Sequence, residues 1–293
     1  MCASDDLQVV HFPHPGGEFH VEGATATRHV DVRWNTSGRH FRRLVGHDGA
    51  YVDAAGKVKH GKLVFWTEWE AATSAIALDG AHDDFSARFL HEVKNPVTYP
   101  LKCRAWGCCT NTDPCVFGST FKYSNCRQYR NRGLLSLRSG SLIIFGSRLK
   151  GEFVLDTVFV VDGDGKEYSA SCELDVSEEY RSLTLSRIGG DLKADPFVFY
   201  RGATPVERRG RPFSFTPARI CGSSYTDLGR RCVIDVETLN SVAGATVLNI
   251  KNTQAAAVRS FSGTVVEKIW GELKRQVLAN GFVLGVHFDW PGR

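Results

Sequence analysis

The sequence has no acidic side chain over a long central stretch. Between Pro114 and Gly151 there is no aspartate or glutamate, against seven lysines and arginines. Residues 152–195 reverse this balance, with eleven acidic and four basic side chains. Such an asymmetry can turn an anionic ligand toward one face of a folded protein. The alternative is that neighbouring strand surfaces simply differ in their solvating charge. The basic stretch favours a phosphate-bearing partner.

Other absences narrow the class of protein further. No apolar run approaches the roughly 20 residues that cross a bilayer, and residues 1–10 lack the features of a secretory signal. Neither the Walker nor the dinucleotide glycine fingerprint occurs, and no G-x-S-x-G motif is present. The nine cysteines are an odd number. We therefore expect a cytoplasmic protein with reduced thiols and no membrane association.

The composition predicts a folded protein that is rich in strands, because 29 glycines separate many short apolar runs. Strands are expected over residues 7–12, 62–70, 141–146 and 153–161. The last is almost continuously apolar, which predicts burial on both faces, and Gly163 and Gly165 are expected to end it. The clearest helix is expected from Thr264 to Asn280, with Thr264 and Glu267 as a capping box and Gly281 beyond its end.

The segment from Tyr123 to Val161 resembles the modified-base readers of the PUA-like superfamily, in particular the EVE and YTH domains. The matching stretches are residues 124–128 (SNCRQ), 134–137 (LLSL), 140–145 (GSLIIF) and 151–161. The whole chain is also similar to an uncharacterised bacterial group associated with nucleotide modification and phage defence. That second likeness rests on residues 11–18, 65–70, 111–114 and 123–126.

The resemblance implies an α+β fold with a PUA-like mixed β-barrel, peripheral helices and a C-terminal helix–strand extension. We expect a single domain over residues 1–293, with the barrel core in about 1–165 and an elaboration in about 166–293. The leading hypothesis is that the protein binds a nucleotide or a modified nucleic-acid base. Its context would be bacterial nucleic-acid modification or phage defence.

A base reader needs aromatic faces for stacking and fixed polar groups at the base edge, and stacking contributes about 1–3 kcal/mol per base. The candidate stacking rings are Trp34, Trp66, Trp69, Phe117 and Tyr123. The candidate edge-reading side chains are Asn35, Asn111, Asp113, Ser124, Asn125 and Gln128. The candidate phosphate ligands are Arg42, Arg43, Arg127 and Arg130. The alternative for each tryptophan is a place in the core.

The rival hypothesis is an enzyme that acts on nucleotides or a related small ligand. Its candidate catalytic residues are His11, His14, Glu68, Glu70 and Cys126. Glu68 and Glu70 share one face of an expected strand, roughly 7 Å apart, which suits acid–base chemistry. Arg127 would depress the pKa of the Cys126 thiol if the guanidinium lies close. A solvated glutamate pair and histidines bonded to backbone are the alternatives, so the sequence leaves catalysis open.

No metal or cofactor is expected. The spacing of His11, His14 and Glu18 matches no metal motif, and the nearby prolines exclude a helix. The cluster C-x4-C-C-x5-C over residues 103–115 lacks the paired knuckles of a zinc ribbon, so buried thiols are expected there. Asp156 interrupts an apolar strand, so if it is buried its carboxylate must be hydrogen-bonded or paired, for example with an arginine. The alternative is a part in acid–base chemistry. A second basic stretch over residues 201–219 either follows a nucleic-acid backbone or forms a solvated loop.

Overall fold

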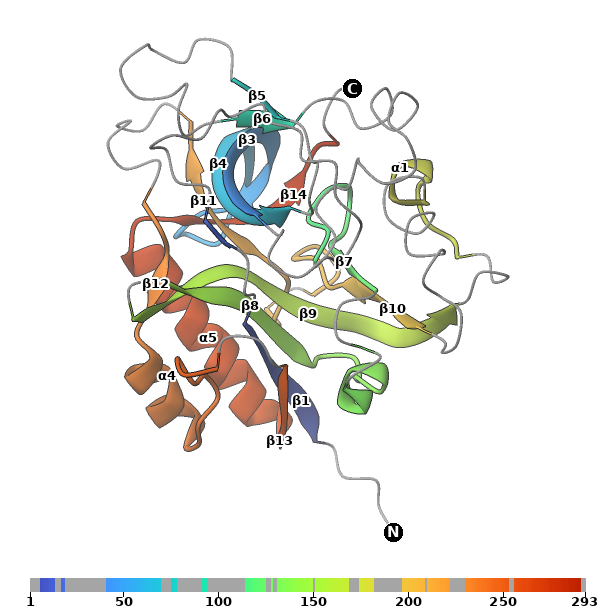
Figure 1. Ribbon diagram of the computed structural model, residues 1–293, viewed down its shortest axis with the longest axis vertical. Helices are drawn as coiled ribbons and strands as arrows, with labels where there is room; N and C mark the ends of the chain where they lie inside the picture. The colour runs from blue at the N-terminus through green and yellow to red at the C-terminus, as the bar shows by residue number, and fades with distance from the viewer. Residues whose placement is uncertain are drawn as a thin grey trace.

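The computed structural model describes residues 6–13, 17–18, 41–69, 75–77, 91–93, 114–124, 128, 131–149, 151–168, 174–181, 197–208, 210–221, 230–252 and 256–290. It describes the backbone alone for residues 17–18, 41–44, 68–69, 75–77, 91–93 and 149. Across these ranges the fold is mostly β, with two sheets of seven strands each and few helices (Figure 1).

The first sheet runs across the middle of the molecule in the order β13-β1-β8-β9-β10-β7, and β12 also pairs with β9 (Figure 1). Its strands are β1 (Leu7–Pro13), β7 (Lys122–Tyr123), β8 (Leu142–Leu149), β9 (Glu152–Tyr168), β10 (Phe197–Gly202), β12 (Val233–Ile234) and β13 (Ala257–Phe261). Strands β1 and β8 are parallel, and the other pairs are antiparallel. The expected strands over residues 7–12, 141–146 and 153–161 are confirmed, and they are neighbours.

The second sheet closes on itself into a four-stranded barrel, because β14 pairs with both β11 and β3 in the order β14-β11-β4-β3. The barrel strands are β3 (Phe41–Val52), β4 (Val58–Trp69), β11 (Thr216–Ile220) and β14 (Val283–Phe288). Short strands β2 (Gly17–Glu18), β5 (Ala75–Ala77) and β6 (His91–Val93) extend the sheet beside β3. Two barrel strands thus come from the C-terminal region, which the sequence predicts to be an elaboration outside the barrel.

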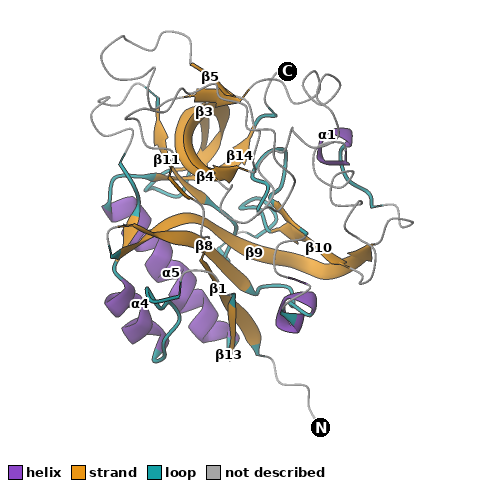
Figure 2. Ribbon diagram, in the orientation of Figure 1, coloured by secondary structure: helices purple, strands orange, loops and turns teal. Residues whose placement is uncertain are grey.

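Two helices, α4 (Val236–Ala243) and α5 (Gly263–Ala279), cover one face of the first sheet (Figure 2). Along β8, Leu142 and Ile144 join the core beneath these helices, whereas Ile143 and Phe145 join the core on the barrel side. This alternation follows from the two-residue period of a strand, and it gives the sheet two buried faces. The buried β9 predicted from its apolar sequence is confirmed.

Helix α5 begins and ends one residue earlier than expected, with Asn280 as its C-cap. Its N-cap is Ser262, which makes no side-chain cap bond, so the expected capping box of Thr264 and Glu267 is wrong. Gly281 follows the C-cap with φ 77°, a left-handed conformation that glycine adopts without steric cost. Within the described ranges, the other helical turns are α1 (Glu178–Tyr180) and a 3-10 helix (Arg132–Leu135).

A buried ion pair joins the first sheet to the region beside the barrel. Asp156 on β9 lies 3.3 Å from the guanidinium of Arg231, and both side chains are less than a tenth exposed. The expectation that a buried Asp156 is hydrogen-bonded or paired is therefore confirmed. The same guanidinium lies over the ring of Trp66 on β4, 4.4 Å from its centroid. None of the helices in the described ranges is long and apolar enough to cross a membrane.

Candidate ligand-binding site

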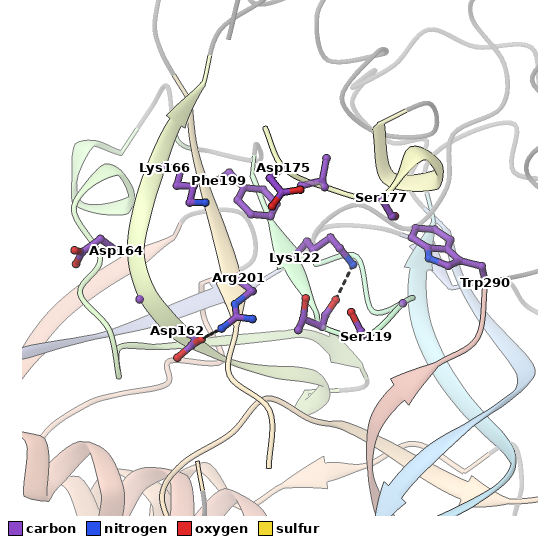
Figure 3. A pocket seen from close by; sticks show the side chains of 14 residues that line it. Ser119, Lys122, Asp162, Asp164, Lys166, Asp175, Ser177, Phe199, Arg201 and Trp290 are labelled. Carbon is purple, nitrogen blue, oxygen red and sulfur yellow. Dashed lines mark hydrogen bonds and ion pairs between the residues drawn. The ribbon is translucent and has the colours of Figure 1, made fainter. Parts of the chain in front are cut away.

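A cavity of about 520 Å³ lies where β9, β10 and β7 run side by side at the end of the first sheet (Figure 3). This volume falls within the range of about 300–1,000 Å³ typical of small-molecule sites. The lining comes from β9 (residues 162–166), β10 (Phe199 and Arg201), β7 (Lys122), the turn at residues 118–120, residues 175–177 and Trp290.

Lys122 places a buried ammonium group at this cavity. Its side chain is only 6% exposed, and its Nζ donates to the carbonyls of Phe117 at 2.9 Å and Thr120 at 2.7 Å. The Nζ also lies 5.5 Å from the ring centroid of Tyr180 and 5.6 Å from that of Trp290. Within the described part of the chain, no carboxylate pairs with it.

Two opposing effects act on the charge of Lys122. Burial lowers the pKa of the amine below its ordinary value, because the charged form loses its hydration. The two carbonyl acceptors and the two ring faces favour the charged form. The carbonyls use two of the three ammonium hydrogens, so one hydrogen remains for a ligand. These contacts hold the amine in a fixed position.

Gly118 allows the turn to bring Lys122 and Trp290 together. Its φ is 87°, and a Cβ at this position would lie 2.9 Å from Nε1 of Trp290 and 3.1 Å from Nζ of Lys122. The Gly118 amide donates to the Phe288 carbonyl at 2.8 Å, which ties the turn to β14. The Trp290 indole stacks on Phe117 with ring centroids 5.9 Å apart. A side chain at Gly118 would therefore displace the indole or the ammonium.

The wall formed by β9 and β10 carries a network of ion pairs. Arg201 pairs with Asp162 and, at 3.0 Å, with Glu207, while Arg208 lies 3.0 Å from the other oxygen of Asp162. Burial would raise the pKa of Asp162, but the bonds from Arg208 and Arg201 outweigh it and hold the pKa below its ordinary value. Figure 3 shows Lys122 extending toward Trp290 and Arg201 turned toward Asp162.

The lining as a whole is balanced in charge. Its cations are Lys122, Lys166 and Arg201, and its carboxylates are Asp162, Asp164 and Asp175. The side chains of Ser119, Thr120 and Ser177 add hydroxyl groups that both donate and accept hydrogen bonds. Trp290 and Phe199 supply the aromatic surface. The site can thus hold an anionic group beside a ring that carries polar edges.

A scan against protein-family models, a search of curated proteins and a search of solved structures each found no significant match to the chain. The resemblance to PUA-like readers stays a prediction. The segment that carries it, residues 123–161, forms parts of β7, β8 and β9 in the first sheet, whereas the closed barrel is built from β3, β4, β11 and β14.

Four of the predicted ligand contacts lie in the protein interior. The rings of Phe117 and Tyr123 are 1% and 0% exposed, so neither offers a free face to a base. The Ser124 hydroxyl lies 2.7 Å from the Tyr180 hydroxyl. The Gln128 amide donates to the Val198 carbonyl and accepts from its N–H, both at 2.7 Å. These four side chains are thus engaged in contacts within the protein.

The other predicted contacts are not brought into the cavity by the described structure. Trp66 is half-buried beneath Arg231 and does not line the cavity. Only the backbone is described for Arg42, Arg43, Glu68 and Trp69, which lie on the paired strands β3 and β4. The remaining candidates lie outside the described residues: Trp34, Asn35, Asn111, Asp113, Asn125, Arg127, Arg130, His14, Glu70 and Cys126.

His11 is a buried core residue on β1. Its side chain is 1% exposed, and its ring packs edge-on against Phe153 with centroids 5.4 Å apart. Burial lowers its pKa to about 4, so the imidazole is neutral at pH 7. It is not part of the cavity lining. The described residues contain no group of three or more His, Cys, Asp or Glu side chains that could hold a metal ion.

Some residues of the cavity belong to patterns in the sequence, but no pattern predicts that they lie together. Lys122 belongs to the acid-free stretch and Arg201 to the second basic stretch, but no motif connects them. Gly163 and Gly165 were expected to end β9, which instead continues to Tyr168. A Cβ at Gly165 would lie 2.3 Å from Cγ1 of Val198, so glycine is needed there for β10 to pack closely. No sequence pattern indicates Trp290.

Proposed function

We propose that the protein binds a nucleotide, or a nucleic-acid base with its phosphate, in the cavity between β9, β10, β7 and Trp290. The observation that carries this proposal is the buried Lys122 ammonium, which has no carboxylate partner among the described residues and lies beside an indole ring. A lysine in such a position suits phosphate, which it binds as a point charge. The ligand class is the one that the sequence suggests, but the proposed site is this cavity instead of the residues predicted from the sequence.

Phosphate binding is supported by the preorganised Lys122 side chain. The two carbonyl bonds fix the Lys122 side chain before any ligand arrives. Binding therefore costs little side-chain entropy, which favours affinity. Lys166 on the neighbouring strand provides a second, exposed cation at the same cavity. Arg201 contributes less, because Asp162 and Glu207 already neutralise it.

The base half of the proposal rests on Trp290 and the polar groups across the cavity. Trp290 is partly exposed, in contrast to Phe117 behind it, and a base stacked on an aromatic ring gains about 1–3 kcal/mol. Asp175 and the hydroxyls of Ser119 and Ser177 line the same space. A carboxylate accepts hydrogen bonds from base amino groups or sugar hydroxyls. The lining thus matches both parts of a nucleotide.

Isothermal titration with nucleotides and short oligonucleotides tests this function. Lys122→Met should weaken binding about 10-fold or more, because a hydrogen bond to a charged group contributes about 1.5–3 kcal/mol. It should also flatten the salt dependence, whereas Trp290→Ala should weaken binding at every salt concentration. Lys268→Met, an exposed lysine on α5, is the matched control and should bind as the wild type does.

Lys122→Met changes a buried side chain and could lower stability. The variant Lys166→Met avoids this problem, because Lys166 is exposed. We expect it to weaken binding several-fold with an unchanged melting temperature. If wild-type protein binds no nucleotide or oligonucleotide, the proposal is wrong. Equal affinities for the Lys122, Lys166 and Lys268 variants would also overturn it, since the cavity cations would then have no part in binding.

A further inference from the structure

The charges around the cavity indicate how many phosphate groups its ligand carries. We propose that the site takes a nucleotide with a single phosphate group and discriminates against nucleoside triphosphates. This inference rests on the proposed function, and it goes further by naming the ligand class. It follows from which cations are available, where the carboxylates lie and how the Lys122 hydrogens are used.

Only two cations of the lining are available to a phosphate. Arg201 is paired with Asp162 and Glu207, and Arg208 completes that network from outside the cavity lining. Lys122 and Lys166 have no carboxylate partner among the described residues. Two positive charges match one phosphate monoester, which carries about −1.5 to −2 at pH 7. A triphosphate would bring more negative charge than these cations can neutralise.

Further phosphates would meet carboxylates. Asp162 is already paired with Arg201 and Arg208, but Asp164 and Asp175 line the same space of about 520 Å³, so further phosphates would share this space with their charges. Like charges a few ångströms apart repel even at a solvated surface. Within the described ranges these three aspartates do not form a group that could hold a metal ion. They are thus not arranged to bind the Mg²⁺ that usually accompanies a triphosphate.

The contacts of Lys122 also favour a ligand with a single phosphate group. Two of its ammonium hydrogens are taken by the Phe117 and Thr120 carbonyls. The one remaining hydrogen can satisfy a single phosphate oxygen. Sites for triphosphates instead surround the phosphate chain with many donors, as the glycine-rich loop of P-loop enzymes does. The sequence has no such loop.

Calorimetric titration of nucleoside monophosphates and the triphosphates of the same bases, with and without Mg²⁺, tests this inference. We expect the monophosphate to bind about tenfold more tightly in both conditions, because repulsion at these distances changes affinity by that order. Asp164→Asn should raise triphosphate affinity several-fold and leave monophosphate affinity within about twofold. Glu267→Gln, an exposed acid on α5, is the matched control and should change neither.

The outcomes separate this inference from the proposed function. If triphosphates bind as tightly as monophosphates or more so, the inference is overturned and the nucleotide site stands. If monophosphates are preferred but the Asp164 variant behaves like the Glu267 control, the charge argument is overturned. If no nucleotide binds, the proposed function fails and the inference falls with it.

Discussion

Substitution of Gly118 by alanine tests the contact that holds Lys122 and Trp290 at the cavity. The new Cβ would lie 2.9 Å from Nε1 of Trp290 and 3.1 Å from Nζ of Lys122, and the residue would keep φ 87°. Gly151→Ala is a close control, because its φ is 89° and nothing lies within 4 Å of its Cβ position. The two variants share the backbone strain, and only Gly118→Ala adds the clash.

The left-handed conformation should cost each variant about 1–2 kcal/mol of stability. Gly118→Ala should lose about 1–3 kcal/mol more, because overpacking displaces the indole or the ammonium. Urea denaturation measures both values. Nucleotide affinity should fall in Gly118→Ala and stay unchanged in Gly151→Ala. If both variants lose equal stability and both bind nucleotide as the wild type does, Gly118 is not the clamp that this reasoning requires.

Two further predictions concern the core. Asp156→Asn should cost about 3–5 kcal/mol in urea denaturation, because it leaves the buried Arg231 guanidinium without its carboxylate. Arg275→Met, at an exposed ion pair, should cost far less, and similar losses in the two variants would contradict the buried pairing. Folding lowers the pKa of His11 from 6.5 to about 4. As the pH falls from about 6.5 to 4, the unfolded chain binds this proton before the folded protein does, so the free energy of unfolding should decrease over this range. His11→Leu should remove about 3 kcal/mol of that decline, and an unchanged pH profile would show that His11 is not buried as a neutral ring.

The elements with strong local patterns were predictable from the sequence, and the long-range pairings were not. The apolar run of β9 and the helical spacing of α5 are properties of single segments, so their burial follows from periodicity, although β9 continues past its predicted end to Tyr168. The barrel depends on the pairing of β14 with β3 across more than two hundred residues of chain. No local pattern specifies that contact, which is why the barrel was assigned to the N-terminal part alone.

In the site, too, the residues that belong to local sequence patterns were predictable and the contacts between distant residues were not. The charge pattern identified Lys122 and Arg201 as members of basic stretches, and β7–β10 pairing brings these two residues opposite each other. Aromatic residues were harder to place, because Phe117 and Tyr123 look the same in sequence whether they stack on a ligand or fill a core. Trp290 and Lys122 are far apart in the sequence and come together beside the turn at Gly118. The place of Trp290 in the cavity therefore depends on tertiary structure.

Photo-crosslinking of an azido-nucleoside monophosphate, followed by peptide mass spectrometry, tests most directly whether the cavity is the nucleotide site. We expect the label on residues 118–122, residues 175–177 or Trp290, and we expect excess unlabelled monophosphate to suppress it. Label that is competed away but maps to the α4–α5 face, or label that no competitor removes, would contradict the central claim.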